Sequence, residues 1–276
     1  MALAPLCAIN KSRAMKRPLL TLYEYCVLYL GLGLLGVLCL LWTPFAAVLH
    51  LVLPRRTGGL VGRFAVMFGF NIYIRCLSLM GACRFDISAL DTLRGQSPMI
   101  IAPNHPCLLD AVMVISRLPN VACIMKASLL DNIFLGAGAR LACYIRNDST
   151  VKMVAEAADS LCEGNHLLIF PEGTRTTHLP INTFMASIGF IARRAGVPVQ
   201  TVFIETDSAY LSKGWPLFRK PSMPITYRIR LGQRFEPEDN VKSFMGKLER
   251  YFADELSGNP PMPELPPAAC TAIGSE

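Results

Sequence analysis

The stretch that decides the fold is residues 97–110, SPMIIAPNHPCLLD, in which an apolar run meets a proline and is followed by a histidine and an aspartate. The run 97–102 predicts a buried strand that Pro103 interrupts, because proline has no N–H to donate inside a sheet. Asn104 and His105 are therefore expected in the loop after the strand, and a helix is expected from about 108 to 117.

His105 and Asp110 are separated by five positions. On a continuous helix this spacing places two side chains about 140° apart, so a regular helix would not let them pair. With His105 in the loop and Pro106 near the first helical turn, the imidazole can fold back to the carboxylate while its other nitrogen faces a substrate. This pattern indicates a general base and the group that orients it. A capping or core histidine is the alternative when the block is taken alone.

A second block, FPEGTR at 170–175, ends another apolar run at 166–170. A turn at the carboxyl end of a strand is where α/β folds commonly bind ligands. Arg175 can fork onto a phosphate and Thr174 can add a hydroxyl bond, while Glu172 can orient an arginine or bond an acceptor hydroxyl. A surface turn with a local ion pair is the alternative for this block without the first. Together, the two blocks suggest acyl transfer to a lipid alcohol.

Strands and helices alternate along the chain, which predicts an α/β domain. Besides the strand at 97–102, short apolar runs predict strands at 84–87, 121–125, 166–170, 197–204 and 227–231. Helical patterns are expected at 108–117, 131–141, 150–162, 184–195 and 241–256. There is no internal repeat, and the tail from 258 onward, rich in proline and small residues, is predicted to be disordered.

The N-terminal part of the chain carries a membrane signal. Residues 26–53 contain no formally charged side chain, and this run exceeds the roughly 20 apolar residues that span a bilayer. Basic residues flank the run on both sides, so the positive-inside rule gives no orientation. A re-entrant pair of helices bent near Thr43 and Pro44 fits, and so does a single crossing with the amino terminus outside. A signal peptide is a weaker alternative, because the run is too long for one.

Residues 60–80 carry Arg63 and Arg75 inside an apolar run with helical spacing. A helix in the headgroup plane whose arginines meet phosphates is one interpretation, and a helix packed on the core with snorkelling arginines is the other. We accordingly divide the chain into a basic segment with membrane anchor at 1–57, an interfacial helical connector at 58–84, a catalytic domain at 85–257 and the tail at 258–276.

The composition suits a membrane-associated enzyme. Of the 276 residues, 52% are hydrophobic and 17% are charged, and the formal net charge is +7. This charge suits anionic lipids and phosphorylated substrates as well as nucleic acid. No long basic run or zinc-ligand spacing accompanies it, so we expect no nucleic-acid partner and no metal. The ten cysteines are scattered without a C-x-x-C pair, which predicts reduced thiols.

The two blocks, in this order and spacing, make the chain resemble the PlsC-like lysophospholipid acyltransferase family, which includes 1-acyl-glycerol-3-phosphate acyltransferases. Residues 104–110 match its H-x4-D block, and 170–175 match its F-P-E-G-T-R block. Two weaker blocks agree, at Lys126 with Gly136 and Arg146, and at 197–199. The resemblance runs from about 87 to 235. It implies a glycerol-phosphate-acyltransferase-like α/β domain, with a mostly parallel or mixed sheet flanked by helices, behind N-terminal membrane-associated helices.

The resemblance implies that His105 is the base and Asp110 its partner. It implies that the acceptor's phosphate is held by Glu172, Gly173, Thr174, Arg175 and Arg146. Lys126 would assist phosphate or oxyanion binding, with a surface lysine at a strand end as the alternative. The implied donor is acyl-CoA or acyl-carrier protein, with no cofactor. The implied partner is membrane lipid, at the inner membrane with the catalytic domain facing the cytoplasm.

Four residues depart from the family's pattern. Ser128 stands where family members often have a carboxylate. Met185 and Ser187 stand where they often have a basic residue and a glycine, and Cys107 stands where serine or glutamine is more usual. The segment 211–215 is similar to a divergent bacterial branch. The base and its partner are unaffected. The identity of the acceptor is left with two possibilities, a lysophospholipid or a non-phosphate lipid or polyene, such as an amino-acid lipid or a glycolipid. Hydrolysis and a non-catalytic membrane adaptor are the remaining classes.

Overall fold

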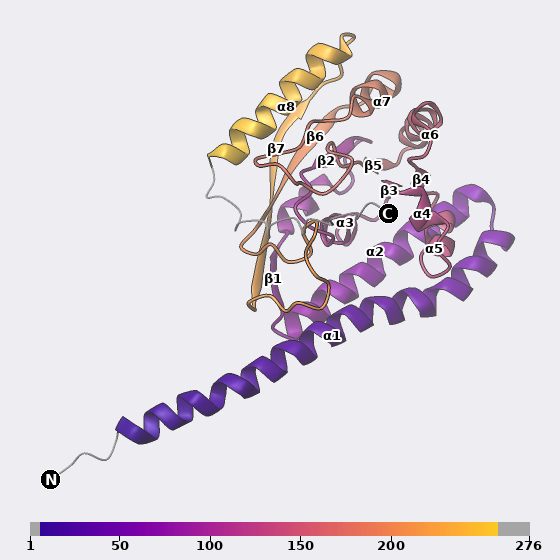
Figure 1. Cartoon of the computed structure of the whole chain (residues 1–276). Coiled ribbons are helices and arrows are strands. Elements are labelled where there is room, and N and C mark those ends of the chain that lie inside the picture. The colour runs from indigo at the N-terminus through magenta and orange to yellow at the C-terminus, as the bar shows by residue number, and fades with distance from the viewer. Residues whose placement is uncertain (1–5, 259–276) are drawn as a thin grey trace, which may run out of the picture.

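A seven-stranded sheet forms the centre of the computed structural model, which describes residues 6–258, with side chains from residue 18 onward (Figure 1). The strand order is β1-β7-β6-β2-β5-β3-β4, and every neighbouring pair is parallel except β6 with β7. The predicted α/β fold with a mixed sheet is therefore confirmed. The strands are β1 (Cys83–Asp86), β2 (Ile100–Pro103), β3 (Val121–Met125), β4 (Ile145–Arg146), β5 (His166–Leu168), β6 (Val199–Thr206) and β7 (Ile225–Phe235).

Helices cover both faces of the sheet, since successive side chains of a strand point to opposite faces. Ile101 and Leu168 are buried in a core shared with α1 (Leu6–Val52), α2 (Arg55–Leu79) and α3, whereas Ile100 and Leu167 are buried in a second core under α6, α7 and α8. The elements beyond the first two helices are η1 (Ser88–Leu93), α3 (Asp110–Ile115), α4 (Ala127–Leu130), α5 (Gly136–Leu141), α6 (Thr150–Cys162), α7 (Ser187–Ala195) and α8 (Val241–Ser257).

Two local predictions differ from the structure. The helix expected at 131–141 begins only at Gly136, because the side-chain Oδ1 of Asn132 accepts from the backbone N–H groups of Phe134 and Leu135 and holds the preceding residues in a turn. An asparagine that bonds its own backbone in this way stabilises a turn. The strand β4 was not predicted, since a strand of two residues has no recognisable alternation.

The first two helices form a long pair that lies along the domain (Figure 1). The helix α1 (Leu6–Val52) continues through Pro44, so the expected junction of two helices near Thr43 and Pro44 is wrong. Packing explains the continuity, because Trp42 and Ala46 on either side of Pro44 join Ala137 and Leu141 of α5 in a small core. The chain turns back instead at Pro54, which precedes α2 (Arg55–Leu79).

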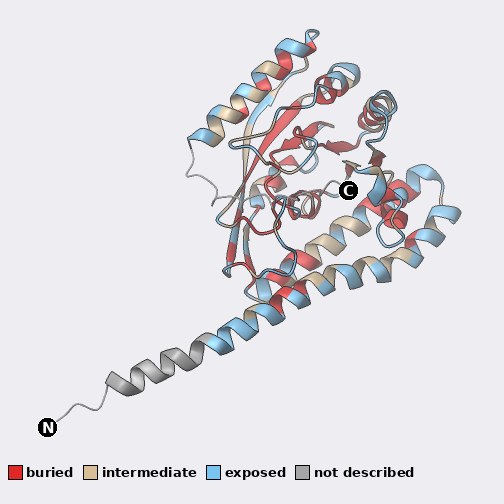
Figure 2. Ribbon diagram, in the orientation of Figure 1, coloured by how far each residue is buried: buried red, intermediate tan, exposed pale blue. Residues whose placement is uncertain are grey.

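The outer surface of the helix pair is apolar and exposed (Figure 2). Pro18–Val52 and Arg55–Leu79 are each long and apolar enough to cross a membrane. More than half of the side-chain surface is exposed at Leu30, Leu41, Phe45, Phe64 and Phe68. An exposed apolar area of this extent is typical of a membrane or protein contact.

The inner surface of α2 is fixed to the catalytic domain by a buried arginine. The guanidinium of Arg63 donates to Asn120 Oδ1 at 2.9 Å, to the carbonyl of Ala142 at 3.2 Å and to Asn165 Oδ1 at 3.0 Å. Arg63 therefore packs on the domain and does not meet headgroups, whereas Arg75 is exposed. The predicted boundary at 57/58 falls inside α2, and all but the first residue of the predicted tail lies outside the described part of the chain.

We expect Gly62→Ala to loosen the contact between α2 and α5. A Cβ atom at Gly62 would lie 2.5 Å from the backbone nitrogen of Ala142, so the helix must shift outward. Overpacking of this kind typically costs about 1–3 kcal/mol of unfolding free energy, measurable by denaturant titration in detergent. Gly69→Ala on the same helix is the control: nothing lies within 4 Å of its added Cβ, so helix propensity should make it neutral or stabilising. Equal stability of both variants would contradict this packing.

Candidate active site

The two sequence blocks meet at one edge of the sheet, because β2 and β5 are parallel neighbours and both end there (Figure 1). The backbone N–H of His105 donates to Glu172 Oε1 at 3.1 Å, and the carbonyl of His105 accepts from the backbone N–H of Thr176 at 2.8 Å. Asn104 anchors the same loop to β6, since its side chain bonds both the N–H and the carbonyl of Ile204. The loop that carries the histidine is thus fixed from two sides.

His105 and Asp110 pair as the sequence predicts. The distance from His105 Nδ1 to Asp110 Oδ2 is 2.7 Å, and the Asp110 side chain is fully buried. The helix α3 begins at Asp110, so His105 lies in the preceding loop and can reach back. The ring of Phe170 stacks on the imidazole with centroids 3.9 Å apart. The carboxylate therefore binds Nδ1 and leaves Nε2 as the nitrogen for a substrate.

Cys107 supplies Asp110 with two more hydrogen bonds. Its backbone N–H donates to Oδ2 at 2.8 Å and its Sγ donates to Oδ1 at 3.0 Å. Burial, together with the Asp110 charge, raises the pKa of the Cys107 thiol well above its usual value, so it stays protonated. A protonated thiol is a poor nucleophile but a usable donor. Cys107 is thus a positioning residue for Asp110.

Glu172 joins the two blocks through its carboxylate. Oε1 accepts from the His105 N–H and from Thr176 Oγ1 at 2.7 Å, and Oε2 accepts from the backbone N–H of Asn182 at 2.9 Å. Burial raises the pKa of Glu172, and these donors and the nearby His105 oppose that rise. Both oxygens are engaged within the protein, and none of these donors is an arginine. The geometry therefore assigns Glu172 to holding the loops together.

Arg175 is held in place by the loop after β6. Its Nη1 donates to the carbonyls of Leu211 and Ser212 at 2.8 and 2.9 Å. Leu211 has a φ of 60°, a left-handed conformation that is unusual for leucine and worth notice at a functional site. Arg175 is partly buried, and among the described residues no hydrogen bond from its Nε or Nη2 is found, so these nitrogens still have protons to donate to a ligand.

The remaining residues of the second block surround this turn. Gly173 has a φ of 65°, and a Cβ there would lie 2.2 Å from Met185 Sδ. Met185, which stands where the family often has a basic residue, therefore places a thioether against the turn. Thr174 is exposed, and its hydroxyl makes no hydrogen bond within the described part of the chain.

The two predicted cations outside the second block lie on the ends of neighbouring strands, since Met125, just before Lys126, is the register partner of Arg146. Lys126 is exposed directly after β3, at the same sheet edge as His105. Arg146 lies on β4, three strands from β2, and pairs with Asp131 at 2.7 Å and Asp148 at 2.9 Å. The structure does not bring Arg146 into contact with the His105 and Arg175 loops.

Sequence reasoning missed several residues that build the site. Thr176, Asn182, Leu211 and Ser212 all bond members of the two blocks. Of these four, only Leu211 and Ser212 were marked in the sequence, because they belong to the segment 211–215 that is similar to a divergent bacterial branch. The others bond through contacts that no periodic pattern reveals.

The site places a histidine, held by a buried carboxylate, near an arginine at the carboxyl ends of the strands. This arrangement fits an acyltransferase. Comparison with known proteins agrees. The acyltransferase family model matches residues 84–205. Human 1-acyl-sn-glycerol-3-phosphate acyltransferase beta is 24% identical over 197 residues, 68% of this chain and 69% of that protein. The 1-acyl-sn-glycerol-3-phosphate acyltransferase of Pseudomonas aeruginosa is 23% identical over 223 residues, 79% of this chain and 83% of that protein.

A solved structure shares the fold over nearly the whole chain. The crystal structure of the 1-acyl-sn-glycerophosphate (LPA) acyltransferase PlsC from Thermotoga maritima superimposes with a TM-score of 0.57 at 18% identity, covering 90% of this chain and 99% of that one. The family model and the two relatives support the PlsC-like acyltransferase family that the two blocks predict, and the solved structure shares its fold. The predicted enzyme class, acyltransferase, is also confirmed.

Replacing Cys107 should separate its role as a donor from that of a nucleophile. Cys107→Ser keeps a donor to Asp110 Oδ1 and should retain activity within a fewfold of the native enzyme. Cys107→Ala removes that donor and should lower kcat by up to about 10–100-fold with little change in KM, since a hydrogen bond to a charged group is worth about 1.5–3 kcal/mol. Cys162→Ala, at an exposed thiol on α6, is the control. Complete loss of activity in Cys107→Ser would point to covalent catalysis.

Glu172→Gln should weaken the junction of the two loops. In glutamine, an NH2 group replaces one of the two carboxylate oxygens. This NH2 group then faces either the N–H of Asn182 or the donors of His105 and Thr176, depending on which oxygen it replaces. One buried donor is then unsatisfied, which costs about 1–3 kcal/mol. We expect a lower melting temperature and lower kcat. Glu249→Gln on α8 serves as the control. A Glu172→Gln enzyme with native stability and kcat would show that the hydrogen bonds to the Glu172 carboxylate are dispensable.

Proposed function

We propose that the enzyme moves a fatty acyl group from acyl-CoA or acyl-carrier protein to the free hydroxyl of a lysophospholipid such as 1-acyl-glycerol-3-phosphate, in phospholipid biosynthesis. The observation that carries the proposal is the 2.7 Å contact between His105 and buried Asp110, near the Nε and Nη2 donors of Arg175. This arrangement supplies a base for a hydroxyl and a cation for a phosphate within one sheet edge.

In the proposed reaction, His105 Nε2 takes the proton of the acceptor hydroxyl while the hydroxyl oxygen bonds to the thioester carbonyl carbon. Asp110 stabilises the imidazolium through Nδ1. The carbon–sulfur bond then breaks, and the leaving thiolate takes the proton from His105. No acyl-enzyme intermediate is required, in keeping with a Cys107 thiol that stays protonated.

The acceptor's phosphate is proposed to bind Nε and Nη2 of Arg175, with exposed Lys126 as a second cation. Arg146 is less suited, because two carboxylates already neutralise it. An acceptor without phosphate is the second candidate. The observation in its favour is Met185, whose thioether lies against the Gly173 turn and offers an apolar contact there.

We further propose that α1 and α2 lie in one leaflet of the inner membrane, with the catalytic domain on the cytoplasmic side. Both helices contact the domain at several points: Glu24 of α1 pairs with Lys220, Ala46 packs against α5, and Arg63 of α2 is buried. A helix that crossed the bilayer would draw these contacts into the hydrocarbon. Lying flat exposes only the apolar outer surface to lipid.

An acceptor panel tests the reaction. Detergent-purified enzyme supplied with acyl-CoA, or with acyl-carrier protein, should acylate 1-acyl-glycerol-3-phosphate, as followed by mass spectrometry. His105→Ala should lower kcat by about 10²–10⁴-fold, the usual contribution of a general base. His178→Ala, at an exposed histidine, is the matched control. Turnover only on phosphate-free lipids would favour the second candidate, and free fatty acid without acylated product would indicate a hydrolase.

Reporter fusions test the membrane arrangement. A helix pair in one leaflet leaves both ends of the chain on the same side, so reporters at the amino and carboxyl ends should both read the cytoplasm. Opposite readings would establish a single crossing instead. Phe45→Asp, at a side chain that is 65% exposed, should also move protein from the membrane to the soluble fraction.

A further inference from the structure

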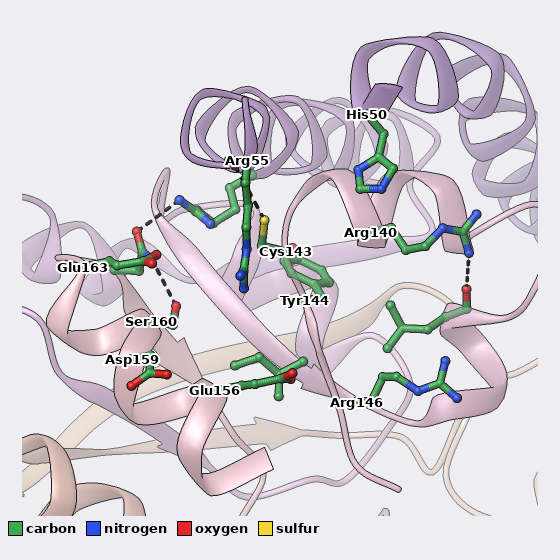
Figure 3. Close-up of a pocket in the computed structure, with 14 residues that line it drawn as sticks. His50, Arg55, Arg140, Cys143, Tyr144, Arg146, Glu156, Asp159, Ser160 and Glu163 are labelled. Atoms are coloured by element: carbon green, nitrogen blue, oxygen red, sulfur yellow. Dashed lines mark hydrogen bonds between the residues drawn. The ribbon is translucent and has the colours of Figure 1, made fainter. Parts of the chain in front are cut away.

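A cavity lies away from the candidate active site, along the free edge of β4 (Figure 3). It has a volume of about 470 Å³ and is bounded by the turn between α1 and α2, by α5 and by α6. That volume falls within the range of small-molecule sites, about 300–1,000 Å³. Because β4 is three strands from β2, the cavity is separate from the His105 loop.

Charges of opposite sign line opposite walls of this cavity. His50, Arg55 and Arg140 come from the helix turn and α5, whereas Glu156, Asp159 and Glu163 come from α6. Figure 3 shows the α6 carboxylates on one side and His50 and Arg140 on the other, with the Arg55 side chain reaching in between. We call these the basic wall and the acidic wall.

The two walls do not neutralise each other. Within the described part of the chain, no ion pair joins a residue of the basic wall to one of the acidic wall. The other two arginines at the cavity are already engaged, Arg63 by buried hydrogen bonds and Arg146 by Asp131 and Asp148. On the acidic wall, Glu156 pairs with Lys152 at 3.8 Å, so Asp159 and Glu163 are the carboxylates with no ion pair in the described part of the chain. A ligand with one sign of charge would be attracted by one wall and repelled by the other, whereas a zwitterion suits both.

The mouth of the cavity adjoins the apolar tip of the helix pair. His50 and Arg55 bracket Leu51 and Val52, whose side chains are 85% and 72% exposed. A polar group in the cavity can therefore continue into acyl chains beside the tip.

We propose that this cavity binds the headgroup of a zwitterionic membrane phospholipid, with its phosphate on the basic wall and its ammonium on the acidic wall. Such a lipid is not a substrate, since the cavity lies apart from His105. It fixes the helix turn at the membrane surface and so holds the enzyme at a constant depth.

Binding of short-chain lipids tests the proposal without any turnover. The full chain in a neutral maltoside detergent is titrated calorimetrically with dihexanoyl phosphatidylethanolamine, with dihexanoyl phosphatidylglycerol and with free phosphoethanolamine. The ethanolamine lipid should bind about tenfold or more tightly than either other ligand, because only it offers both charges and the chains. Equal binding of the two lipids would overturn the role of the acidic wall, and equal binding of free phosphoethanolamine would overturn the lipid assignment.

Variants locate the site. Arg55→Ala and Glu163→Gln should each weaken binding of the ethanolamine lipid about fivefold or more, as expected for loss of one charged contact. Arg56→Ala and Asp254→Asn are the controls, because both side chains are exposed and neither lines the cavity. Unchanged affinity in both cavity variants, with melting temperatures equal to the native protein, would exclude this cavity.

Competition separates the cavity from the active site. Saturating 1-acyl-glycerol-3-phosphate should leave the affinity for the ethanolamine lipid unchanged, since the ligands occupy different places. Displacement by that acceptor would assign the binding to the catalytic loops and overturn the proposal. The experiment measures binding and not turnover, so its result does not depend on whether the enzyme acylates this acceptor.

Discussion

The active site depends on one buried carboxylate that joins two loops. Glu172 accepts hydrogen bonds from the backbone of His105, from the Thr176 hydroxyl and from the Asn182 backbone. The loops come together because β2 and β5 are adjacent and parallel, but adjacent strands alone do not fix the register of the loops beyond them. A carboxylate with three donors does, because moving either loop would leave buried groups unsatisfied. His105 is thus positioned through its backbone before its side chain meets Asp110.

Much of this arrangement follows from local sequence. The apolar runs before Asn104 and at 166–170 predict neighbouring strands, and the histidine, the aspartate and Arg175 then fall at one edge. The rest depends on contacts between distant segments. Glu172 reads in the sequence as a ligand of substrate or arginine, yet its partners are three donors whose positions only the folded chain defines. Arg146 likewise reads as part of the phosphate site, but its strand pairs at the outer edge of the sheet.

The N-terminal helices are an integral part of the fold and not a detachable anchor. Hydropathy marks α1 correctly as apolar, but it cannot separate the surface that faces lipid from the surface that faces protein. Arg63 illustrates the difficulty, because a charge within an apolar helix suggests a headgroup contact until its buried amide partners Asn120 and Asn165 are known. Pro44 illustrates another, since packing of Trp42 and Ala46 against α5 maintains a helix that proline would otherwise break.

The left-handed Leu211 gives the site a mechanical link to its surroundings. Its carbonyl accepts from Arg175, while a few residues further on Phe218 is 62% exposed and approaches Tyr29 of α1, with ring centroids 6.0 Å apart. One short loop therefore touches both the guanidinium and the apolar surface of the helix pair. The same Leu211 carbonyl also accepts from the backbone N–H of Leu108, between His105 and Asp110, at 3.2 Å. Any force that shifts this loop, such as lateral pressure from a more tightly packed or more curved leaflet, therefore acts on Arg175 and on the His105 loop together. The physical state of lipid around the proposed membrane helices would accordingly alter both the affinity for the acceptor and the rate of the chemical step.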